Sequence, residues 1–141
     1  MRINTSLKKM SRKQIKQICR IVIRWCVDHL GENHRIKKDL KIETVYNTPI
    51  FDGFAEYDID EDNCIIRIYM DFNPTIRHVI LACLHEYRHY LQPTTTKYDK
   101  LYKKYFYKNH PFEKEARQTE EKFYQVCWED IKPIVEKLFD K

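Results

Sequence analysis

The sequence contains little glycine and no long apolar run. Only two of its 141 residues are glycine, so tight turns should be few and helices long. No uninterrupted apolar run approaches the ~18 residues that a membrane helix needs. No secretory signal follows the basic N-terminus either, because Arg20 and Arg24 interrupt the apolar stretch there. These absences predict a soluble, intracellular protein without a membrane partner.

Paired cysteines are also missing. The five cysteines are odd in number, and no two of them form a CxxC motif. Cys19, Cys26 and Cys83 stand among apolar residues at helical spacing, which favours reduced thiols in the core over disulfides. We therefore expect a reducing compartment, the cytoplasm.

Size and composition indicate one folded domain. A chain of 141 residues suits a single core, and 43% apolar residues exclude a disordered tail. We expect a loose basic arm over residues 1–10 and a single domain over residues 11–141. The formal net charge of +5 permits contact with nucleic acid but does not require it.

The first half of the domain carries signals for one helix and several strands. Ser11 and Gln14 form a capping-box pattern, apolar residues then recur at helical spacing, and Gly31 is a stop signal. An amphipathic helix is predicted over residues 12–30. Alternating segments then predict strands of a small, mostly antiparallel sheet over residues 40–46, 54–59 and 64–71.

Two further helices complete a predicted α+β fold. Asn73 and Pro74 read as the N-cap and first position of a helix that Pro93 ends. Pro111 should open a long C-terminal helix, which Pro133 should kink or end.

The motif HEYRH falls in the last turns of the second predicted helix. Two histidines four residues apart, His85 and His89, lie ~40° apart around the helix, so both can reach one Zn²⁺ ion. Glu86 flanks them and can take a proton from a water on the metal. By chance, HExxH is expected in a chain of this composition about 2 times in 100. The motif therefore predicts a zinc site with Glu86 as the catalytic residue.

A catalytic zinc site usually has a third protein ligand. The metzincin extension is excluded, because Gln92 and Thr95 stand where that pattern needs Gly and His. The remaining candidates lie around the start of the last predicted helix: His110, Glu113 and Glu115.

HExxH on one helix and ExxA at the start of the next resemble the gluzincins. In particular, the chain is similar to small phage- and mobile-element-encoded metallopeptidases and to the ImmA/IrrE-like group. The resemblance rests on HEYRH and on Glu113 and Ala116. It implies a zincin-like fold, a peptidase activity and Zn²⁺ held by His85, His89 and Glu113.

Two positions qualify this resemblance. Glu115 lies ~200° further round the helix than Glu113, so the two cannot both face one ion. Arg117 stands where related families often carry Asp or Asn to support a histidine ligand, which leaves that supporting role unassigned.

SprT-like proteases are similar in their order of elements, and their pattern would make His110 the third ligand. The gap to His110 is long for that group, and its zinc-ribbon cysteines are absent. One further pattern supports a DNA-linked protease as an alternative. Aromatic residues alternate with lysines over residues 97–108, as on surfaces that stack bases and contact phosphates. A lid beside the cleft is an equally good interpretation of this segment.

The predicted function is zinc-dependent hydrolysis of peptide bonds in a protein or peptide substrate. The alternative is a zincin-fold binding or regulatory protein that does not turn over substrate. The strand over residues 64–71 is expected to edge the cleft, as in zincins. His78 is expected to be structural. The sequence does not indicate which residue stabilises the oxyanion; the candidates are Tyr98, Tyr102, Tyr105 and His110. It does not indicate an oligomeric state either.

Overall fold

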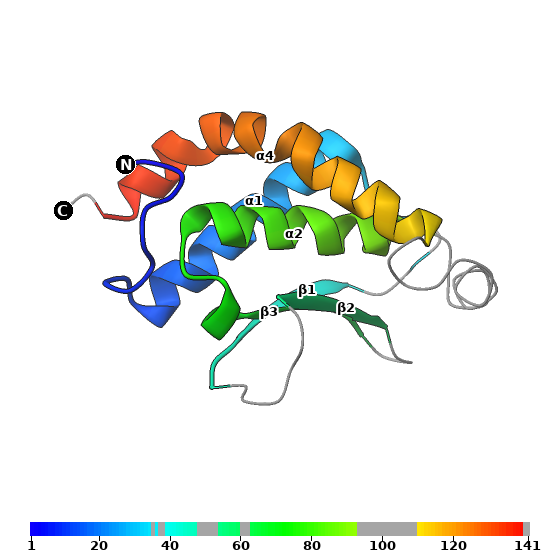
Figure 1. The fold of residues 1–141 in the computed structure, drawn as a ribbon, viewed down its shortest axis with the longest axis horizontal. Helices are drawn as coiled ribbons and strands as arrows, with labels where there is room; N and C mark the ends of the chain where they lie inside the picture. The colour runs from blue at the N-terminus through cyan, green and yellow to red at the C-terminus, as the bar shows by residue number, and fades with distance from the viewer. Residues whose placement is uncertain (35, 37–38, 48–53, 60–62, 93–109, 140–141) are drawn as a thin grey trace.

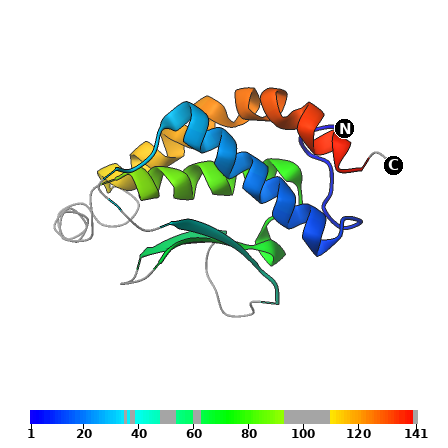
Figure 2. The same ribbon diagram turned by 180° about the vertical axis from the view of Figure 1, so that it is seen from behind.

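The computed structural model describes residues 1–34, 36, 39–47, 54–59, 63–92 and 110–139. Within these residues three helices lie on one side of a small sheet (Figure 1). The helix that carries HEYRH, α2 (Ile76–Leu91), lies between the sheet and the C-terminal helix, and the N-terminal helix crosses behind it in Figure 1 and in front of it in Figure 2. The described part of the chain is therefore α+β, as predicted.

Helix α1 (Arg12–Leu30) has the bounds that the sequence predicts. The Ser11 side chain accepts from the Gln14 backbone N–H, and the Gln14 side chain accepts from the Ser11 backbone N–H. At the other end Gly31 has φ 84°, and its N–H donates to the Val27 carbonyl. Both local signals are confirmed.

The sheet is mixed, not mostly antiparallel. Its strands are β1 (Leu40–Val45), β2 (Ala55–Ile59) and β3 (Cys64–Tyr69), in the order β1-β3-β2. Strand β3 pairs in parallel with β1 and antiparallel with β2. Because CIIRIY is apolar almost throughout, burial favours the central position for β3. The prediction that residues 64–71 form an edge strand is therefore wrong. Strand β3 is central, and β2 is the edge strand next to α2.

Helix α2 begins two residues later than predicted. Its N-cap is Thr75, whose side chain accepts from the His78 N–H. A short 3-10 helix, η1 (Met70–Phe72), comes before it. Asn73 is buried instead, and its side-chain amide donates to the carbonyls of Phe54 and Tyr69. The predicted cap thus ties the sheet to the start of α2.

The last helix, α4 (Pro111–Lys137), begins at the predicted proline. Pro133 lies inside it without ending it. A proline removes one backbone hydrogen bond, but Ile131 and Val135 on either side are buried in the core and keep that turn in place.

The N-terminal arm is not loose. The Leu7 N–H donates to the Pro74 carbonyl, and the N–H groups of Ile76 and Arg77 donate to carbonyls of the arm. Leu7 is 5% exposed and belongs to the core. The arm therefore fixes the start of the helix that carries the HEYRH motif.

Candidate metal centre

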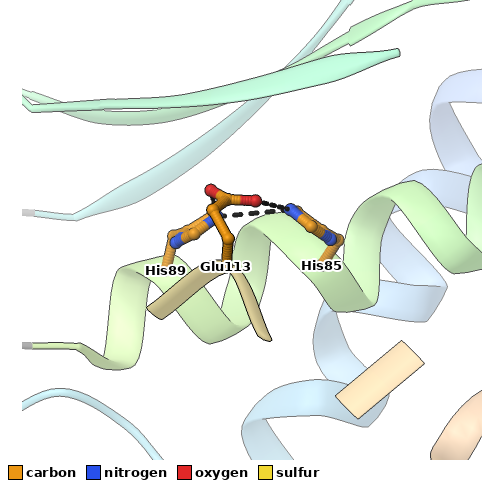
Figure 3. A group of neighbouring side chains, drawn as sticks. All are labelled: His85, His89 and Glu113. Atoms are coloured by element: carbon orange, nitrogen blue, oxygen red, sulfur yellow. Dashed lines mark hydrogen bonds and ion pairs between the residues drawn. The ribbon is translucent and has the colours of Figure 1, made fainter. Parts of the chain in front are cut away.

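Helix α2 presents His85 and His89 of the HEYRH motif to the first turn of α4. His85 and His89 lie one turn apart with ring centroids 4.9 Å apart and a ring angle of 71°. Their side chains are 20% and 12% exposed. Their Nε2 atoms are 3.3 Å apart, and both point to one spot (Figure 3).

Glu113 comes to this spot from the first turn of α4. Pro111 occupies the start of that helix, and the side chain of its N-cap residue, His110, accepts from the Phe112 N–H. The Glu113 carboxylate lies 3.1 Å from His85 Nε2 and 2.7 Å from His89 Nε2. Glu113 is only 3% exposed.

These three side chains form a group that can hold a metal ion. Their candidate ligand atoms lie within 4.8 Å of one another. Ligands ~2.1 Å from a tetrahedral zinc ion would be about 3.4 Å apart, close to the 3.3 Å between the two Nε2 atoms. A histidine ligand must be deprotonated at the ligating nitrogen, and a cation between the two Nε2 atoms would satisfy both lone pairs. The residues therefore fit a metal ion.

Without a metal the group behaves as a buried ion cluster. Burial alone would lower the pKa of His85, but its hydrogen bond with Glu113 and the nearby Glu120 outweigh burial and raise the pKa to about 10. The pKa of His89 is raised in the same way, against burial, by Glu113 and Glu86. Burial would raise the pKa of Glu113, but the two histidines lower it well below its ordinary value.

Glu86 differs from His85, His89 and Glu113 in its surroundings. It is 5% exposed, and its Oε2 atom is buried without a hydrogen-bond partner in the described structure. Burial raises the pKa of Glu86, opposed by the charges of His89 and His85. An unpartnered carboxylate oxygen with a raised pKa is suited to accept a proton.

Two further residues contact the far nitrogens of the histidine rings. Gln92 Oε1 lies 2.7 Å from His89 Nδ1, and Glu120 Oε1 lies 3.7 Å from His85 Nδ1. An acceptor at Nδ1 keeps the proton there and leaves Nε2 free for a metal. Glu120 follows Glu113 by seven residues, two helical turns, so helical spacing could have identified it.

The other predicted candidates do not join the group. The Glu115 side chain is exposed and accepts from Gln92 Nε2. His110 is fully buried as the cap of α4. Arg117 lines the neighbouring cleft. Tyr98, Tyr102 and Tyr105 lie outside the described residues, as does the whole segment 97–108.

A cleft of about 460 Å³ adjoins the three side chains. Residues Phe54 and Ala55, at the start of edge strand β2, line one side. His85, Glu86 and Glu113 line another side, so the cleft opens directly onto the candidate metal centre. His78 lines it too, and its Nδ1 lies 2.6 Å from Thr75 Oγ1, in keeping with its predicted structural role.

Among the described residues, no helix is both long and apolar enough to cross a membrane. Comparison with protein-family models finds no match, and comparisons with curated proteins and with solved structures find none either.

Proposed function

We propose that this protein is a zinc-dependent metallopeptidase of the gluzincin type, with Glu86 as general base and then general acid. One observation carries the proposal. His85, His89 and Glu113 converge on a single point, and an unpartnered, buried Glu86 lines the cleft that opens there. Two histidines and a glutamate are the donor set of a known class of catalytic zinc sites.

Each residue has a separate task in this proposal. His85, His89 and Glu113 would hold Zn²⁺, which when bound lowers the pKa of water to ~7 and polarises the scissile carbonyl. Glu86 takes a proton from the attacking water and passes it to the leaving amine. The burial of Glu86 favours the protonated form between the two steps.

The cleft suits an extended peptide. Strand β2 pairs with β3 on one side only within the described residues, so its other edge can pair with a substrate backbone. Ala55, the first residue of β2, lines the cleft beside Phe54, whose ring is exposed. A substrate strand along β2 would therefore pass in front of Glu86.

Glu86→Gln is the decisive test. The variant should still bind about one Zn²⁺ per chain, because Glu86 is not a ligand. Peptide cleavage should fall by at least about 100-fold, because the amide cannot accept the proton. Zinc content is measured by elemental analysis, and cleavage by mass spectrometry of a proteome-derived peptide mixture. Glu121→Gln, an exposed position of α4, is the matched control.

The outcomes separate the candidate functions. A wild-type protein that binds no Zn²⁺, or cleavage that survives Glu86→Gln, contradicts the proposal. If both proteins bind one Zn²⁺ per chain and neither cleaves peptides, the protein is a metal-containing binding protein and not a peptidase.

A further inference from the structure

The charge of this chain is distributed unevenly. Its first 27 residues contain eight of the 26 Lys and Arg residues and none of the 21 Asp and Glu residues. The remainder of the chain is therefore net acidic. The eight basic residues of this first segment lie on the N-terminal arm and on α1: Arg2, Lys8, Lys9, Arg12, Lys13, Lys16, Arg20 and Arg24.

Helix α1 arranges its share of these charges in a stripe. At 100° per residue, its five basic residues fall within about 120° of the helix circumference and extend for about 18 Å along it. Four of them are exposed, and Lys16 is half-buried; we call Arg12, Lys13, Lys16, Arg20 and Arg24 the basic stripe.

Few groups neutralise the basic stripe. Arg24 pairs with Asp28 at 3.5 Å, although its side chain is still 78% exposed, and Arg12 lies over the Tyr46 ring. Lys13, Lys16 and Arg20 form no ion pair with any described residue. A row of unpaired cations attracts a polyanion, because binding releases the counterions of the polyanion.

The location of α1 favours nucleic acid over a membrane surface. An amphipathic helix that binds membranes inserts its apolar face, but the apolar face of α1 is used in the core, where Ile18, Cys19 and Val22 are fully buried. Helix α1 lies behind α2 in Figure 1 and in front of it in Figure 2. No residue of α1 lines the cleft, so a ligand on the stripe leaves the cleft open.

We propose that the basic stripe of α1 binds the phosphate backbone of nucleic acid, without reading its sequence. The test uses the full chain and a fluorescein-labelled 20-base-pair duplex DNA. Fluorescence anisotropy gives Kd at 50, 100 and 200 mM NaCl. The triple variant K13Q/K16Q/R20Q should bind at least about tenfold more weakly at 50 mM NaCl. The slope of log K against log salt should become shallower by about 2 to 3.

A matched control separates the stripe from net charge. K122Q/K132Q/K137Q removes the same number of charges from α4 and should bind DNA as the wild type does. Equal loss in both triple variants, or no wild-type binding at 50 mM NaCl, overturns the proposal. Tighter binding to vesicles containing phosphatidylserine than to DNA overturns it in favour of a membrane surface. Circular dichroism verifies that each variant is folded.

Discussion

At the scale of single residues, the site depends on which carboxylate of α4 faces the histidines. Glu113 and Glu115 are two residues apart on one helix, but the first is buried against both imidazoles and the second is exposed. Glu113→Gln should weaken Zn²⁺ binding by more than about 100-fold, beyond the usual effect of residues behind the ligands. Glu115→Gln should leave it unchanged. Competition with a chromophoric chelator measures both, and equal affinities in the two variants would exclude Glu113 as a ligand.

The residues that would bind the metal can be predicted from the sequence more easily than the contacts that support them. HExxH has a fixed spacing on one helix, so His85 and His89 can be placed from the motif alone. Glu113 needed a resemblance, because nothing local indicates which residue of another helix completes the group. In the sequence, Gln92 served only to exclude the metzincin pattern. Its contact with His89 could not be predicted, because it depends on where the chain turns after α2.

At the scale of elements, Gln92 joins the two helices that supply the candidate ligands. Its Oε1 faces His89 on α2, and its Nε2 donates to the Phe112 carbonyl in the first turn of α4 at 2.8 Å. With 6% exposure it is a buried clamp between the elements. The clamp therefore has two functions: it orients a histidine ring and it fixes the start of α4.

Two substitutions separate these functions. Gln92→Leu removes both contacts, together with the hydrogen bond to Glu115, and should weaken Zn²⁺ binding by about 10–100-fold. Gln92→Glu lacks the donor for Phe112 and Glu115 but keeps the acceptor that orients His89, so affinity should stay near that of the wild type. Its metal-free form should be less stable by about 1 kcal/mol. Chelator competition and thermal melts give the two quantities, with the exposed Gln125→Leu as control. Wild-type affinity in Gln92→Leu would show that the amide does not position His89.

Local signals predict the helices well, and non-local contacts decide the rest. The Ser11 capping box and Gly31 gave both ends of α1, because these interactions lie within a few residues of each other. The parallel pairing of β1 with β3 joins strands separated by the whole of β2, so no turn signal encodes it. Asn73 was misplaced for the same reason, since its amide bonds to Phe54 rather than to its own helix.

At the scale of the whole molecule, one core joins the sheet and the three helices of the described residues, and each of these helices contributes at least one cysteine to it. All five cysteines are free and buried, which confirms the predicted core thiols. Burial raises the pKa of Cys26, and burial also raises that of Cys127 to about 12. The reactive thiolate of Cys26 and Cys127 is therefore scarce at neutral pH in the folded protein.

The thiols should report on global unfolding. In the native protein, reaction with DTNB at pH 8 should be about a thousandfold slower than in 6 M guanidinium chloride, because reagent enters only when the core opens. All five should react in the denaturant. With increasing urea, thiol reactivity and the circular dichroism signal should change at the same midpoint, since one core supports all the elements. A thiol that reacts natively at the unfolded rate would show that part of the helical layer opens independently of the sheet.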